Sequence, residues 1–273
     1  MSVLHGILLG IVQGLTEFLP ISSSAHLVLV PYLLGWDFPA EQIFPFDVLV
    51  QLGTLVAVIV YFWKDLWSIA RAWVTGLARR APFESADSRL GWYLILATIP
   101  AGLFGLTIKN TVEAAFQSPT ATAVFLFVTA AFLFLAERLG RRARSLDAMN
   151  WKDALVMGLF QAVSIFPGVS RSGSTITGGM LRNLDRPAAA RFSFLMSIPI
   201  MIAAGLLSLG DLASIPNLSQ FLPVILAGIV TAGIVGYLSI RWLLGYLTRH
   251  SLSVFAIYCI ILGMLVIGTA YVW

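Results

Sequence analysis

Charged residues are scarce in this chain of 273 residues. They make up 11% of the sequence, whereas soluble domains carry about 25%. Hydrophobic residues make up 59%, and the mean hydropathy is +0.90. So few charges cannot cover a surface that faces water, which excludes a soluble globular protein and indicates lipid as the solvent. The composition therefore predicts an all-α integral membrane protein.

Cysteine is almost absent as well, because Cys259 is the only one. It lies in an apolar run, and a single thiol excludes an intrachain disulfide. The net charge of +4 does not indicate a nucleic-acid partner, because the basic residues lie in short segments between apolar runs. No linker is long enough to divide the chain, so residues 1–273 are predicted to form a single domain.

Long apolar runs are abundant, and six of them are long enough to cross a bilayer, which takes about 20 residues. They lie near 44–63, 91–108, 120–137, 189–209, 220–240 and 252–272.

Two further apolar stretches, 5–34 and 152–181, are interrupted at their middle by a proline and a serine-rich turn. The turns read Leu19-Pro20-Ile21-Ser22-Ser23-Ser24 and Phe166-Pro167-Gly168-Val169-Ser170-Arg171-Ser172-Gly173. Each half of such a stretch has about 14 residues, too few to span a membrane as a helix. Both stretches are therefore predicted to be re-entrant helical hairpins.

The two interrupted stretches match each other at an offset of 148 residues. Matching pairs are Gly10 and Gly158, Gln13 and Gln161, Phe18 and Phe166, Ser22 and Ser170, and Ser24 and Ser172. A weaker similarity joins Val124-Phe125 to Val254-Phe255. The chain thus divides into repeat one, 1–140, and repeat two, 150–273. Each repeat has one hairpin and three spans, and because three is odd the repeats are predicted to be inverted in topology.

The distribution of basic residues predicts the orientation. If the N-terminus lies outside, the inside regions are 64–90, 138–152, 182–191 and 241–250, which hold 15 of the 17 Lys and Arg residues. This agrees with the positive-inside rule. Both termini are therefore expected on the outer side.

Ionisable residues within apolar segments usually mark function, and here they gather in the two hairpins. Gln13 and Glu17 are four residues apart and share a helix face. Ser23 and His26 are three apart, close enough for a contact between hydroxyl and imidazole. In the second hairpin, Arg171 opens a helix whose N–H groups favour an anion. If the tips of the inverted hairpins meet, these groups form a site for phosphate or diphosphate.

The two turns carry a family resemblance. The segment from Gln13 to His26 resembles the first signature of the bacterial undecaprenyl-diphosphate phosphatases of the bacitracin-resistance type, Glu/Gln-x-x-x-Glu followed by Pro-x-Ser-Ser and His. Residues 167–175 resemble the second signature, Pro-Gly-x-Ser-Arg-Ser-x-x-Thr. Length and hydropathy agree over the whole chain.

The resemblance implies hydrolysis of undecaprenyl diphosphate to undecaprenyl phosphate and inorganic phosphate, which recycles the cell-wall lipid carrier. It also implies a multi-pass protein of the bacterial inner membrane with a site open to the periplasm, and therefore periplasmic termini. A divalent cation, Mg²⁺ or Ca²⁺, is expected on Glu17. The matching positions are catalytic Glu17, Ser23, His26 and Arg171, and substrate-binding Gln13, Ser22, Ser170, Ser172 and Thr175. Some family members have Glu in place of Gln13, so this site has one anionic ligand fewer.

Alternatives stay open at this point. The nucleophile is Ser23 with His26 as its base, a water activated by His26, or His26 itself. A lipid-phosphate flippase or secondary transporter is the rival function, because inverted repeats with broken helices are typical of transporters. A homodimer is also considered.

Overall fold

The structure is a computed structural model of the chain. It describes all residues except 39, 108–114, 116–117, 212–217 and 273. The described part is helical and contains no strand, and its one isolated bridge joins Arg144 to Leu184.

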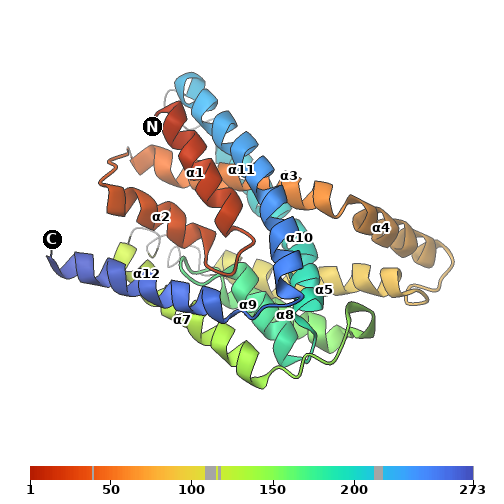
Figure 1. The fold of residues 1–273 in the computed structure, drawn as a ribbon. Coiled ribbons are helices and arrows are strands. Elements are labelled where there is room, and N and C mark those ends of the chain that lie inside the picture. Colours follow the sequence, from red (N-terminus) through yellow and green to blue (C-terminus); the bar gives the residue numbers. More distant parts are fainter. Residues whose placement is uncertain (39, 108–114, 116–117, 212–217, 273) are drawn as a thin grey trace.

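The helices follow one another through the whole chain (Figure 1). They are α1 (Val3–Thr16), α2 (Ser23–Leu34), α3 (Ala40–Tyr61), α4 (Trp63–Ala78), α5 (Ala86–Thr107), α7 (Pro119–Leu139), η1 (Leu146–Ala148, a 3₁₀ turn), α8 (Trp151–Val163), α9 (Arg171–Leu181), α10 (Arg186–Asp211), α11 (Leu218–Leu247) and α12 (Ser253–Val272). We call α1–α2 the first hairpin and α8–α9 the second hairpin.

Four helices are long and apolar enough to cross a membrane: Ala86–Thr107, Pro119–Leu139, Arg186–Leu206 and Leu218–Leu247. The pair α3–α4 passes the same test together, but it is bent by 74°. Large apolar side chains such as Leu206, Val230 and Ile234 are 59–66% exposed on the outer face, which suits lipid rather than water. The chain is therefore a helical multi-pass membrane protein.

The region 64–90, expected as a loop on the inner side, contains a helix, α4. It begins directly after the bend at Phe62 and runs beside α5, where the Trp73 and Trp92 rings lie 5.3 Å apart. Charged residues alternate with tryptophans along α4, and its Trp63 and Trp67 are exposed. This mixture lowers the mean hydropathy of the segment, so the search for apolar runs did not detect it.

The hairpins pack against helices from the opposite halves of the chain. Helix α1 lies along α11, and α8 lies along α5. Both contacts need a glycine: a Cβ on Gly10 would lie 2.6 Å from the Gly228 carbonyl oxygen, and one on Gly158 would lie 2.6 Å from the Ala97 carbonyl oxygen. The final helices α7 and α12 pack against each other.

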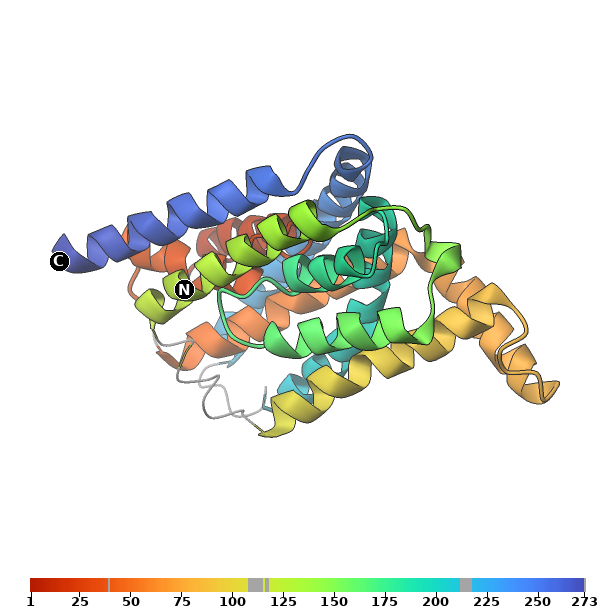
Figure 2. The same cartoon turned by 90° about the horizontal axis from the view of Figure 1, so that it is seen from below.

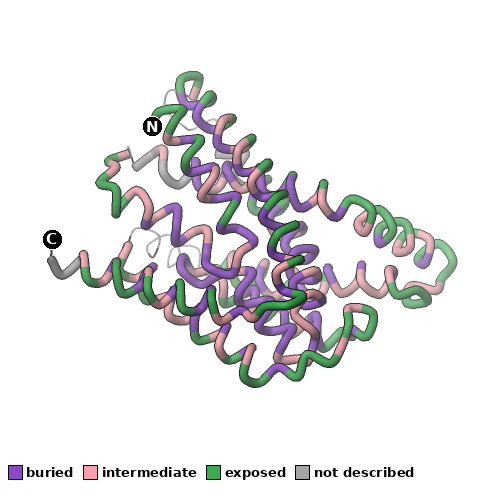
Figure 3. Tube along the Cα trace, in the orientation of Figure 1, coloured by how far each residue is buried: buried purple, intermediate pink, exposed green. Residues whose placement is uncertain are grey.

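Both ends of the chain lie at the same end of the bundle, on the left of Figures 1 and 2. The turn between α4 and α5 lies at the opposite end. Burial is densest at α9, where every residue from Ser172 to Met180 is buried (Figure 3). The tips of both hairpins therefore meet inside the protein.

Candidate active site

The first hairpin turns between Glu17 and Ser22. Glu17 caps the C-terminus of α1, and Ser22 caps the N-terminus of α2 by accepting a hydrogen bond from the Ala25 N–H at 3.3 Å. Ser22 has φ 70°, a left-handed conformation that favours glycine. A non-glycine residue held there stores strain, which is concentrated at functional sites.

The second hairpin turns in the equivalent place. Gly168 has φ +99° and supplies the left-handed residue of this turn. Ser170 caps α9 by accepting from the Gly173 N–H at 3.1 Å, and Arg171 is the first helical residue. The chain therefore brings a guanidinium and the N–H groups at the start of α9 to one point.

The two turns are joined to each other directly. The Gly168 N–H donates to Ser22 Oγ at 3.2 Å, and the Ser172 hydroxyl donates to the Leu19 carbonyl at 3.1 Å. The predicted meeting of the two hairpin tips is therefore present in the fold.

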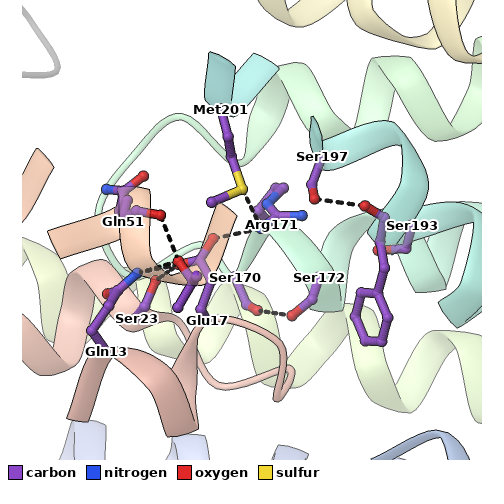
Figure 4. A network of polar contacts seen from close by, with 12 residues as sticks. Gln13, Glu17, Ser23, Gln51, Ser170, Arg171, Ser172, Ser193, Ser197 and Met201 are labelled. Carbon is purple, nitrogen blue, oxygen red and sulfur yellow. Dashed lines mark hydrogen bonds and ion pairs between the residues drawn. The ribbon is translucent and has the colours of Figure 1, made fainter. Parts of the chain in front are cut away.

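The Glu17 carboxylate is the centre of the polar network in Figure 4. It accepts from Arg171 Nη2 at 2.5 Å, from the Ser23 hydroxyl at 2.5 Å and from Gln13 Nε2 at 2.9 Å. Glu17 is only 8% exposed, and burying a carboxylate is costly unless it is paired and hydrogen-bonded, as it is here. An acid, a guanidinium and a hydroxyl from both hairpins therefore share one site.

Two polar atoms at this site are buried without a hydrogen-bond partner among the described residues. They are Arg171 Nη1, a donor, and Gln13 Oε1, an acceptor. Unpaired buried polar atoms are costly, so they indicate a missing ligand. A cationic donor beside helix N–H groups suits a phosphate oxygen.

Among the described residues the ring nitrogens of His26 make their hydrogen bonds elsewhere than to the Ser23 hydroxyl, which differs from the expectation based on their spacing. Its Nδ1 lies 2.7 Å from the Ser22 carbonyl oxygen, and its Nε2 lies 2.7 Å from the Tyr258 hydroxyl on α12. Since a carbonyl only accepts, Nδ1 carries the proton, and in the neutral ring Nε2 would accept from the Tyr258 hydroxyl. The carboxylate of Glu17, and not the imidazole, is the base in contact with the Ser23 hydroxyl.

The remaining predicted substrate residues lie beside the site and hold its framework. The Ser170 and Ser172 hydroxyls lie 3.2 Å apart. The Thr175 hydroxyl donates to the Arg171 carbonyl at 2.8 Å and lies 2.6 Å from Ser193 Oγ on α10. In this arrangement Thr175 is engaged with the protein, and its contact with substrate stays a prediction.

A divalent cation fits only in part. The described residues contain no group of three or more His, Cys, Asp and Glu side chains arranged around a metal. Glu17 has used three of about four acceptor positions, and Gln13 Oε1 is unpartnered beside it. Mg²⁺ is commonly held by one or two carboxylates with substrate phosphates and water. The residues therefore suit a cation that arrives with a diphosphate.

Several contributors were missed from the sequence. Thr54 on α3 lies 3.4 Å from Gln13 Nε2, and Met201 Sδ on α10 lies 3.7 Å from Arg171 Nη2. Tyr258 and Thr129 come from α12 and α7. Each lies in a span far from the hairpins in sequence, and no local pattern distinguishes it from a packing residue.

The comparisons with known proteins agree with one another. Residues 6–265 match the family model described as bacitracin resistance protein BacA. Undecaprenyl-diphosphatases are similar over nearly the whole chain. The one from Thermomicrobium roseum is 46% identical over 98% of both chains, that from Chlorobaculum tepidum 44% over 99% of both, and that from Moorella thermoacetica 45% over 98% of both.

This similarity extends across both hairpins and all the spans, so it covers every residue of the site. With Glu17, Ser23 and Arg171 joined at the meeting point of the two signature turns, the chain belongs to the bacitracin resistance protein BacA family.

Proposed function

We propose that this protein is a membrane-embedded phosphatase that hydrolyses undecaprenyl diphosphate to undecaprenyl phosphate and inorganic phosphate. The similar undecaprenyl-diphosphatases support the reaction. One observation carries it in the structure: Glu17 accepts hydrogen bonds from both the Ser23 hydroxyl and Arg171. That arrangement supports Ser23 as the nucleophile and Arg171 as the phosphate-binding cation.

Substrate binding depends on the second hairpin. Arg171 Nη1 and the N–H groups at the start of α9 would receive the terminal phosphate oxygens. Phosphoryl transfer develops charge on these oxygens, and fixed donors in a site that excludes water stabilise that charge. Gln13 Oε1 and Glu17 would hold a divalent cation on the diphosphate, and the cation would neutralise part of its charge.

Ser23 is the proposed nucleophile, with Glu17 as its base. The Ser23 oxygen attacks the terminal phosphorus as its proton passes to Glu17, 2.5 Å away. The bond from that phosphorus to the bridging oxygen breaks, and undecaprenyl phosphate leaves. Water then cleaves the phosphoserine, releasing inorganic phosphate and returning the proton to Ser23.

The proposed role of His26 changes accordingly. Both of its ring nitrogens are engaged, with the Ser22 carbonyl and the Tyr258 hydroxyl. In the proposal, His26 acts as a proton carrier for the leaving group or the attacking water after Tyr258 releases Nε2. Direct attack by water and a phosphohistidine at His26 are the competing routes.

The proposed architecture has six transmembrane helices, two re-entrant hairpins and an inverted-topology repeat. Its support is the reciprocal packing of α1 on α11 and α8 on α5, together with the contact between the final helices. The paired glycines, Gly10 and Gly158, support it in sequence. In this proposal α3 is the span and α4 lies at the inner surface, and the 74° bend between them supports that assignment.

The proposed orientation puts both termini and the opening of the site on the periplasmic side of the bacterial inner membrane. The common location of the termini and the basic residues at the other end support it. Cysteines introduced at Ser2 and at Arg249 in a Cys259→Ala background would test it. We expect an impermeant thiol reagent on intact cells to label position 2 and leave position 249 unlabelled, and the opposite pattern would refute the proposed orientation.

The experiment that tests the function uses detergent-purified protein, in which no gradient exists. We expect phosphate release from undecaprenyl diphosphate by the wild type, lost in Glu17→Gln and Arg171→Ala. A flippase or transporter would bind the lipid without turnover, and that result would overturn the proposal. The possible homodimer stays a prediction that light scattering on the same sample would test.

A further inference from the structure

The turn before Arg171 is held by a side chain from another part of the chain. Thr129 is fully buried on α7, and its hydroxyl donates to the Gly168 carbonyl at 2.8 Å. The same oxygen accepts from the Ser170 N–H at 2.8 Å. One hydroxyl thus bonds to two backbone groups immediately before Arg171.

Helix α7 also shapes this turn by close packing. A Cβ on Gly168 would lie 2.3 Å from the Thr122 carbonyl oxygen and 2.7 Å from Phe125 Cβ. The Phe125 ring stacks on Phe166, with their centres 5.2 Å apart. Gly168 is therefore fixed from two sides, by α7 at its carbonyl and by Ser22 at its N–H.

The other half of the chain repeats this contact in a weaker form. The match of Val124-Phe125 with Val254-Phe255 aligns Thr129 with Cys259, and the hairpin match aligns Gly168 with Pro20. Cys259 Sγ lies 3.9 Å from the Pro20 carbonyl oxygen. In each half of the chain, a side chain of the last helix (Thr129 or Cys259) therefore contacts the turn of a hairpin. The Cys259 contact is the weaker one, because a thiol is a weak hydrogen-bond donor. Of these two side chains, only Thr129 makes two strong hydrogen bonds to its turn.

We infer that Thr129 is a positioning residue of the phosphatase reaction, which holds Arg171 and the N–H groups of α9 where the terminal phosphate binds. The inference rests on the proposed function. Loss of the hydroxyl leaves the Gly168 carbonyl and the Ser170 N–H unpaired in a buried place, so the turn relaxes and Arg171 shifts. Thr129 acts through Arg171 and need not touch substrate.

The test compares Thr129→Val with Thr129→Ser in purified protein. We expect the valine variant to lower kcat by about 10-fold to 100-fold, because a small misplacement of a catalytic group has that effect. We expect KM to change less, and Thr129→Ser to restore kcat. Thr98→Val is the matched control, because Thr98 is half-buried on α5 and its hydroxyl donates within its own helix to the Leu94 carbonyl at 2.7 Å. Its kcat should equal that of the wild type.

A double variant, Thr129→Val with Arg171→Lys, distinguishes a positioning role of Thr129 from a general loss of structure. Because Thr129 acts through Arg171, adding Thr129→Val to Arg171→Lys should lower kcat far less than it does in the wild type. Equal losses in both backgrounds would overturn the inference. If Thr129→Val does not fold, Thr129→Cys replaces it, with an intermediate kcat expected, and a wild-type kcat would overturn the inference. An inactive wild type would instead overturn the proposed function and the inference with it.

Discussion

The first residue of α2 is Ser23, the first residue of α9 is Arg171, and these positions align in the two hairpins. One half therefore places a hydroxyl where the other places a guanidinium. Glu17 aligns with Ile165, so only one half carries the carboxylate that both groups contact. The comparison teaches that two matching turns can supply different groups to one site, and the proposed function assigns attack to the first hairpin and charge stabilisation to the second.

Glu17 and Asp153 are two buried carboxylates that can be compared by their partners. Glu17 contacts one arginine and a reactive hydroxyl, whereas Asp153 in the first turn of α8 contacts two arginines. Arg144 lies 2.7 Å from Asp153 and Arg182 lies 2.9 Å away. Asp153 thereby ties the segment between the repeats to the end of the second hairpin. In the proposal, Glu17 serves the reaction and Asp153 serves the fold.

The largest effect is expected at Arg171. Arg171→Ala removes the cation from the phosphate and leaves Glu17 buried without its ionic partner, so kcat should fall by about 10³-fold or more. Arg171→Lys keeps the charge but loses the planar guanidinium, so its kcat should fall less than that of Arg171→Ala. Steady-state phosphate release measures both. Near-normal activity of Arg171→Ala would contradict the proposed role of the second hairpin in phosphate binding.

The next effect is expected at Glu17. Glu17→Gln keeps the shape of the side chain but cannot accept the Ser23 proton, so kcat should fall by about 10²-fold to 10³-fold. Single-turnover phosphate release on folded protein measures the change. If Glu17→Gln lowered only thermal stability and left kcat intact, the carboxylate would be structural, as Asp153 is.

Asp153→Asn should produce the opposite pattern. It leaves Arg144 and Arg182 without their carboxylate, which should lower stability by about 3 kcal/mol. The kcat of the protein that remains folded should stay near that of the wild type. Thermal unfolding followed by tryptophan fluorescence, with activity measured on the same sample, checks both. A large loss of kcat at an unchanged Tm would show that the two carboxylates do not differ in role.

The smallest effect concerns pH. Burial by itself would raise the pKa of Asp153, but hydrogen bonds from Arg144, the Asn150 backbone and Arg182 outweigh it and hold the pKa below its ordinary value of 3.8. A lowered pKa stabilises the fold above the unfolded pKa and loses this contribution as pH falls through the folded pKa. The Tm of the wild type should therefore drop below about pH 4 more steeply than that of Asp153→Asn. If the Tm of both proteins fell equally with decreasing pH, the lowered pKa assigned to Asp153 would be contradicted.

Much of the site was predictable because its signals are local. A proline beside a serine-rich turn breaks both apolar stretches, and helix breaks occur at both. The four-residue spacing of Gln13 and Glu17 becomes a 2.9 Å hydrogen bond. The predicted inverted repeat would bring the two hairpin tips together, and the hydrogen bond between Arg171 and Glu17 agrees with that prediction.

The rest depends on contacts that no local pattern encodes. The spacing of Ser23 and His26 predicts a contact between them. In the structure the Ser23 hydroxyl, which follows the left-handed residue Ser22, donates to Glu17 instead. The His26 imidazole forms its hydrogen bond with Tyr258, which is 232 residues away in the sequence. Thr129 is one of several small polar residues in its span, and only its place against Gly168 distinguishes it. Tertiary packing therefore decided which hydroxyl meets which base.

The most direct test of this division of labour is a rapid-quench experiment with undecaprenyl diphosphate labelled on its terminal phosphate. We predict a transient phosphoserine at Ser23, formed more slowly in Arg171→Lys and absent in Ser23→Ala. Full turnover with no labelled protein at any time, or with the label on His26, would contradict the account.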